Sequence, residues 1–231
     1  MPLTHERRSS ALAPVLSTDA KHIEGRAAVF YNAADPGTEY VYRMTNPSNP
    51  KGEPIEVRER IFVGAFTRAL AEDEVVCYYN HEHNIGRRVA GDPSNTMELS
   101  VDAQGLNYRT LLPDHMYGQM VREAIQRKDV RGSSFQFAPR PGGVTWRQEG
   151  KYLIRELRDL FLYDASPVDR PAYTSTTADL RSECRADERD AIVPLLVEPE
   201  TQAELVNLQR QWDADRANAL RLQLKLGQSS E

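Results

Sequence analysis

Gly132-Ser133-Ser134-Phe135-Gln136-Phe137 is the stretch from which the fold of this chain can first be inferred. Small, polar and aromatic residues alternate along it, and in a β-strand alternate side chains face opposite sides. Phe135 and Phe137 are therefore expected to face the core together with Ser133, whereas Ser134 faces the other way. We interpret Ser134 as a residue that borders a substrate groove. The alternative is an exposed polar position on a half-buried strand, which is common in proteins.

The composition is that of a water-soluble protein with one core. The chain has 231 residues, of which 40% are hydrophobic and 27% charged, and this length can bury one core with an appendage. Its net charge of -5 gives no reason to expect a nucleic-acid partner. Cys77 and Cys184 are too few for a disulfide framework, which fits a reducing cytoplasm. Residues 191–197 are too short an apolar stretch to span a membrane, and residues 11–16 are too short for a signal peptide.

Hydrophobic patterning divides the chain into four parts. We expect a flexible tail over residues 1–20, a folded domain over 21–180, a charged linker over 181–200 and an amphipathic helix over 201–227. Within the domain, short runs of β-branched and aromatic residues recur at regular spacing. This pattern predicts a β-rich α+β fold, with an antiparallel barrel or sandwich and a few helices.

The expected elements follow from the same pattern. A long surface loop is expected over residues 31–54, which are rich in Pro, Asn, Gly and Ser. One helix is expected over residues 64–72, and a second of about three turns after Asp114, which we expect to cap it. Strands are expected at residues 25–30, 56–62, 75–81, 97–101, 106–112, 133–138, 144–146 and 151–164.

Two histidines lie at the end of an expected strand, in Tyr79-Asn80-His81-Glu82-His83. A serine is a poor nucleophile unless a neighbouring base takes its proton, and histidine suits that task at neutral pH. His81 is nearer the apolar strand that would hold it rigid, so we expect it to be the base, with His83 able to support or replace it. One alternative is a metal site formed by His81, His83 and Glu82, and another is a polar strand end running into a turn.

A carboxylate ends the apolar run Leu160-Phe161-Leu162-Tyr163-Asp164. A buried carboxylate is costly unless it is paired, and pairing with an imidazole N–H would satisfy it. Asp164 would then orient the histidine and stabilise the imidazolium formed during acylation. The alternative is that it caps a turn before Ser166-Pro167. With Ser134 and His81, it completes the set of groups that a serine protease needs.

At these segments the chain resembles the prohead proteases of tailed phages. The resemblance covers residues 21–178 and follows the order of the family's motifs. The matching segments are Gly64-Ala65-Phe66, Asn80-His81-Glu82 with Gly86, Gly105-Leu106, Gly132-Ser133-Ser134-Phe135-Gln136-Phe137 and Asp164-Ala165-Ser166-Pro167-Val168-Asp169-Arg170-Pro171-Ala172.

The resemblance implies a fold, a site and an activity. The fold would be the antiparallel β-barrel of the herpesvirus assembly protease, flanked by helices. His81 would be the general base, Ser134 the nucleophile and Asp164 the orienting acid, at a position where the family usually has Glu. No cofactor or metal is implied. The turn over residues 140–143 is a candidate source of the backbone N–H groups that stabilise an oxyanion.

The activity implied is that of a serine endopeptidase which cleaves scaffold protein, major capsid protein and itself during prohead maturation. Such a protein would lie in the host cytoplasm, packaged inside the immature capsid, with a second copy of the chain as a further candidate partner. Residues 201–227 would dock it on scaffold or capsid, or form a dimerisation helix. The alternative is a non-enzymatic assembly protein that keeps a protease-like fold.

Overall fold

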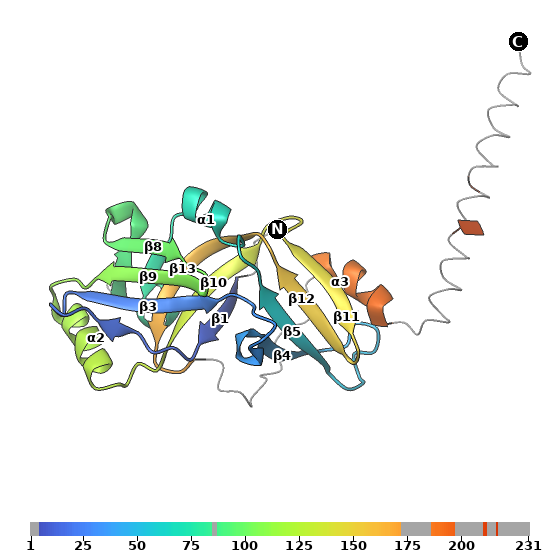
Figure 1. The fold of residues 1–231 in the computed structure, drawn as a ribbon, viewed down its shortest axis with the longest axis horizontal. Helices are drawn as coiled ribbons and strands as arrows, with labels where there is room; N and C mark the ends of the chain where they lie inside the picture. The colour runs from blue at the N-terminus through green and yellow to red at the C-terminus, as the bar shows by residue number, and fades with distance from the viewer. Residues whose placement is uncertain (1–4, 85–86, 172–185, 197–209, 212–215, 217–231) are drawn as a thin grey trace, which may run out of the picture.

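The structure is a computed structural model that describes residues 5–84, 87–171, 186–196, 210–211 and 216 (Figure 1). It has the β-rich α+β fold that the sequence predicted, with three sheets and few helices. The first sheet has the order β1 (Glu6–Ser10), β10 (Gly132–Pro139), β13 (Leu160–Val168), β6 (Val76–Tyr78) and β7 (Arg88–Gly91). The second has the order β11 (Val144–Glu149), β12 (Tyr152–Leu157), β5 (Ile55–Ile61) and β4 (Tyr40–Met44). The third has the order β2 (Val15–Leu16), β3 (His22–Val29), β9 (Gly105–Leu111) and β8 (Met97–Val101).

Helices lie around these sheets. Figure 1 shows α2 at one end of the molecule, where it packs against β2, and α3 at the other end, beside β11. On α2, Val121 and Ile125 are buried, whereas Met116 and Met120 are exposed. The helices are α1 (Thr67–Glu72), α2 (Met116–Gln126) and α3 (Ala186–Ile192), with short 3-10 helices η1 (Pro36–Thr38), η2 (Tyr79–His81), η4 (Asp92–Ser94) and η5 (Val193–Leu196).

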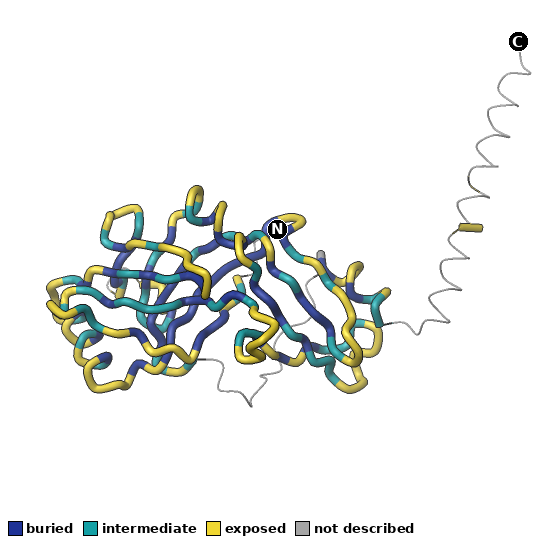
Figure 2. The backbone as a smooth tube through the Cα atoms, in the orientation of Figure 1, coloured by how far each residue is buried: buried dark blue, intermediate teal, exposed yellow. Residues whose placement is uncertain are grey.

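Strand β10 is buried at every residue because β1 and β13 pair with its two edges and other elements cover its two faces. The buried strands of this region are the dark segments of Figure 2. Phe135 and Phe137 belong to the main core, and their rings stack with centroids 5.0 Å apart. The register of β10 against β13 shifts between Gln136 and Phe137. Leu162, Tyr163 and Asp164 of β13 oppose only two residues of β10, so the extra residue lies on β13 and places Asp164 opposite Gln136 rather than on the face of Leu162.

A second, smaller core lies under the β4–β5–β12 sheet. Tyr42, Met44, Val57 and Leu153 come from the strands, and Ile192 of α3 completes the cluster. Helix α3 lies in the segment that was expected to be a charged linker. It contributes the apolar side chain of Ile192 to this core, and the carboxylate of its Glu188 is buried as well.

The N-terminal segment differs from the expected tail. Residues 6–10 form β1, which pairs antiparallel with β10, and residues 15–16 form β2. Gly132 at the start of β10 permits this approach, because a Cβ there would collide with the carbonyl of Ser10. Within the expected loop over residues 31–54, strand β4 pairs with β5 and buries alternate residues.

Three further expectations have different outcomes. The prediction that Asp114 caps α2 was wrong, because the N-cap is His115 and no side chain makes a capping hydrogen bond there. The strand pairings of the described residues form no closed barrel, so the herpesvirus-type barrel stays a prediction. The expected amphipathic helix over residues 201–227 lies almost entirely outside the described residues.

Candidate active site

Ser134 lies on β10, between β1 and β13 of the first sheet, and is only 1% exposed. Its Oγ lies 2.7 Å from Nε2 of His81, which is distant in sequence. This distance is within hydrogen-bonding reach, as required of a nucleophile and its general base. The contact brings together the first two residues that the sequence singled out.

His81 reaches this position through an unusual turn. Strand β6 ends at Tyr78, and the next three residues form η2, in which Asn80 and His81 have φ angles of 56° and 55°. Non-glycine residues rarely adopt this left-handed conformation, and functional sites are where it tends to persist. The side chain of Asn80 accepts a hydrogen bond of 2.9 Å from the backbone N–H of Asp169, which ties η2 to the segment after β13. The sequence predicted a continuous strand to His81, but the strand ends three residues earlier.

Asp164 is fully buried on β13, between β10 and β6. Its Oδ1 lies 3.2 Å from Nδ1 of His81. The pair is close enough for an ion pair, but the ring N–H is not aligned for a hydrogen bond. Catalytic hydrogen bonds are often poorly aligned in the free enzyme and tighten when substrate binds. A small rotation of the ring would align the two groups.

Ser166 holds the carboxylate of Asp164 from the same strand. Its hydroxyl donates to Oδ1 of Asp164 and accepts a 2.9 Å hydrogen bond from the backbone N–H of Tyr78. Ser166 therefore joins β13, which carries Asp164, to the end of β6, which leads to His81. No role was predicted for Ser166, although it stands two residues after Asp164 and so shares its face of the strand.

His83 borders the same carboxylate from a more open position. Its side chain is 43% exposed, and its Nε2 lies 3.5 Å from Oδ2 of Asp164. The same nitrogen lies 2.9 Å from Oε1 of Gln136, whose amide nitrogen in turn lies 2.9 Å from Nδ1 of His5. Asp164 thus lies between two imidazoles, of which only that of His81 contacts Ser134. Gln136 was missed as a site residue, although it shares a strand face with Ser134.

Strand β1 covers Ser134 from the remaining edge of β10. Ser9 lies directly opposite Ser134 in the register, and the hydroxyl of Ser134 donates a 2.8 Å hydrogen bond to the backbone carbonyl of Arg8. A hydroxyl has one hydrogen to donate. While it donates to Arg8, His81 can contact it only by donating from Nε2, and in that tautomer the ring cannot accept the serine proton.

Other groups near the site have structural roles. The thiol of Cys77 is fully buried, and burial raises its pKa well above the ordinary value, so it is a poor nucleophile at neutral pH. In the turn over residues 140–143, the backbone N–H of Arg140 donates to the carbonyl of Asp159, and that of Gly143 donates to the carbonyl of Arg140, so these two groups are not free oxyanion donors.

The described residues contain no group of three or more His, Cys, Asp or Glu side chains arranged to hold a metal ion. Over the same residues, no helix has the length and apolar character needed to cross a membrane.

Comparison with known proteins gives one match. A family model described as caudovirus prohead serine protease matches residues 21–189. The matched region includes all of the residues placed around Ser134 except those of the N-terminal strand. No curated protein and no solved structure matches the chain.

Proposed function

This chain belongs to the caudovirus prohead serine protease family, and we propose that it is a serine endopeptidase of the Ser-His-Asp type. The observation that carries the proposal is the 2.7 Å contact between Ser134 and His81, with Asp164 on the opposite side of the same ring. A nucleophile, a base and a group that orients the base form the arrangement that acyl transfer requires.

In the proposed mechanism, Oγ of Ser134 attacks a peptide carbonyl carbon while Nε2 of His81 takes the hydroxyl proton. The C–N bond then breaks, His81 returns the proton to the leaving amine, and an acyl-enzyme remains on Ser134. Water attacks the ester with His81 again acting as base, which releases the new carboxyl end. Asp164 holds the ring through Nδ1 and stabilises the imidazolium at each stage. No step calls for a cofactor.

Family membership suggests capsid proteins as the substrates and the procapsid interior as the location. We propose that the enzyme cleaves scaffold protein, major capsid protein and itself, within the immature shell in the host cytoplasm. The expected herpesvirus-type barrel and the docking or dimerisation role of residues 201–227 are part of the same proposal.

The second candidate is a non-enzymatic assembly protein with the same fold. The covered nucleophile is the observation that favours it, because a Ser134 that is 1% exposed cannot meet a substrate without a rearrangement. An inert descendant would nevertheless have no need to keep serine, histidine and aspartate in contact range.

Co-expression with the major capsid protein separates the two candidates. We expect the wild-type chain to trim the capsid subunit and Ser134→Ala to leave it at full length. Ser133→Ala is the matched control, since this buried neighbour contacts Tyr108 rather than His81. Equal trimming by Ser134→Ala and the wild type would remove Ser134 as the nucleophile, and no trimming by the wild type would favour the assembly protein.

A further inference from the structure

Strand β1 lies against the nucleophile in the way that an extended peptide substrate would. It pairs antiparallel with β10 from Glu6 to Ser10. The carbonyl oxygen of Arg8 is 2.8 Å from Oγ of Ser134. In acyl transfer, the carbonyl beside the nucleophile belongs to the residue that precedes the scissile bond. Pairing of a peptide with an exposed strand edge is also a common mode of peptide recognition.

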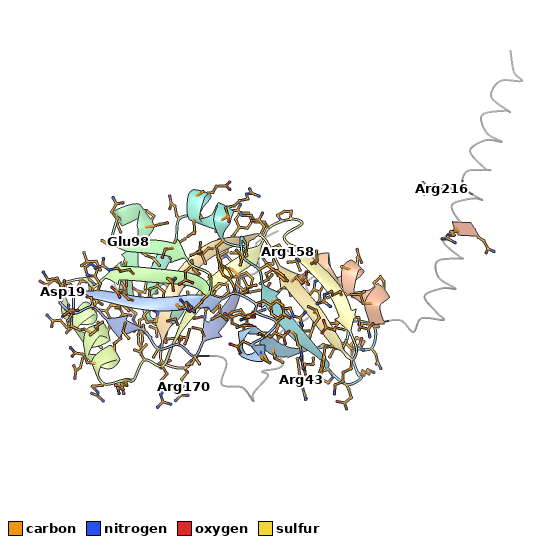
Figure 3. All side chains as sticks on the ribbon, in the orientation of Figure 1. Asp19, Arg43, Glu98, Arg158, Arg170 and Arg216 are labelled. Atoms are coloured by element: carbon orange, nitrogen blue, oxygen red, sulfur yellow. The ribbon has the colours of Figure 1, made fainter. Side chains whose placement is uncertain are left out.

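The side chain of Arg8 enters a built pocket. Its Nε lies 2.6 Å from Oε1 of Glu59 and its terminal nitrogen 2.8 Å from Oε2, so the pair is bidentate. The rings of Tyr42 and Phe137 flank the guanidinium, with centroids 5.0 and 5.5 Å away. The side chain of Glu59 is fully buried. This arrangement contrasts with surface arginines such as Arg43 and Arg170, which extend into solvent at the periphery of Figure 3.

The charges around the pocket favour a cation even when β1 is absent. Arg155 bonds to Glu59 and Glu188, which belong to β5 and α3, and also to Glu6 of β1. Without β1, the fully buried carboxylate of Glu59 loses both hydrogen bonds from Arg8 and, among the described residues, keeps the one from Arg155. Buried carboxylates require compensation, and a planar guanidinium supplies two parallel hydrogen bonds where an ammonium cannot.

We propose that β1 occupies the substrate site of the enzyme, and that the Glu59 pocket takes a basic side chain, preferentially arginine, from the residue before the scissile bond. This inference rests on the proposed protease function. It makes Glu59 a specificity-determining residue and makes residues 6–10 a built-in competitor of the substrate. A substrate strand must displace β1 before His81 can take the proton of Ser134.

The pocket can be tested with quenched fluorescent peptides that carry residues 5–13 of this chain. Three peptides differ only at the position of Arg8, which is arginine, lysine or glutamine. For the wild-type chain we expect cleavage after the basic residue, with kcat/KM highest for arginine and roughly 10- to 100-fold lower for glutamine. For Glu59→Gln we expect the preference for arginine over glutamine to fall at least about tenfold.

Glu56→Gln is the matched control, because Glu56 is on the same strand and pairs with Arg58 outside the pocket. It is expected to keep the wild-type preference. The peptide series on the wild-type chain stands even where Glu59→Gln fails to fold. Equal cleavage of the arginine and glutamine peptides by a chain that labels at Ser134 would overturn the pocket and leave the protease function intact. An absence of both cleavage and labelling, in the wild type and in Arg8→Ala alike, would contradict the protease function, and the pocket with it.

The built-in competitor has its own test in the full-length chain. Arg8→Ala removes the side chain that holds β1 in the pocket, so we expect a fluorophosphonate probe to label Ser134 about tenfold faster than in the wild type. Arg7→Ala removes the same charge from an exposed position on the same strand and is expected to label at the wild-type rate. Equal labelling rates for Arg8→Ala and Arg7→Ala would overturn the role of β1.

Discussion

Oγ of Ser134 lies 2.7 Å from Nε2 of His81, although 53 residues separate them in the chain. The two residues reach each other because β6 and β10 both lie beside β13 in one sheet. The turn η2 follows β6 and places the ring of His81 against Ser134. Asp164 of β13 completes the contact from between the two strands. Strand β13 therefore carries Asp164 and also sets the positions of Ser134 and His81, because it pairs with both β10 and β6.

Replacement of Asp164 by asparagine tests the orienting role. An amide keeps the shape of the carboxyl group but is neutral, so it no longer stabilises the imidazolium or selects the reactive tautomer. We expect Asp164→Asn to lower kcat by about 10³- to 10⁴-fold while the chain stays folded. Steady-state cleavage of a peptide substrate measures this. Asp169→Asn, at a residue whose hydrogen bond to η2 comes from its backbone N–H, is the control, and similar losses in both variants would argue against a specific role.

The two histidines should differ strongly in their effects. His81 contacts Ser134, so His81→Ala should lower kcat by about 10²- to 10⁴-fold. His83 is partly exposed and contacts Asp164, Gln136 and the ring of Tyr78 but not Ser134, so His83→Ala should lower kcat by less than about tenfold, since solvent screens its interaction with Asp164. Parallel kinetics of the two variants decide the assignment. A larger loss in His83→Ala than in His81→Ala would exchange their roles.

Much of this site could be predicted from the sequence because its residues lie on strongly patterned strands. The alternation around Phe135 and Phe137 placed Ser134, and the apolar run before Asp164 placed the acid. The role of Gln136 was not visible, since its partners His83 and His5 are distant in sequence and lie outside the strands. Ser166 was missed because its link to the backbone of Tyr78 depends on how β13 pairs with β6. The presence of a glutamine or serine on a strand does not by itself predict such a contact.

Strand β1 shows where sequence patterning fails. Its residues, Glu-Arg-Arg-Ser-Ser, have no hydrophobic period, and such a polar run is typical of a tail. Its position depends on Glu59 and Arg155, which are distant in sequence and bind its charged side chains. Strand β4 is different, because its Tyr-Val-Tyr-Arg-Met sequence does alternate, and composition alone placed it in a loop.

Two buried acids of the core predict the response to alkaline pH. Burial raises the pKa of the Cys77 thiol and of the Tyr108 phenol, so the folded chain keeps protons that the unfolded chain loses. Above the ordinary pKa values of these groups, about 8.5 and 10, the unfolded state binds fewer protons. The free energy of unfolding should therefore be unaffected by these groups at neutral pH and should fall as pH rises.

Urea unfolding of the full-length chain at a series of pH values measures this slope. Tyr108→Phe should cost about 1 kcal/mol at neutral pH, because it loses the hydrogen bond to Ser133, and should flatten the decline at high pH. Tyr31→Phe, at a partly exposed tyrosine, is the control. An equally steep decline in Tyr108→Phe would show that this phenol does not contribute.

The most direct test that Ser134 is a nucleophile activated by His81 is to locate a fluorophosphonate adduct in the full-length protein by peptide mass mapping. We expect one adduct, on Ser134, which is lost in His81→Ala and retained in Ser133→Ala. An adduct on another serine, or equal labelling of Ser134 with and without His81, would contradict it.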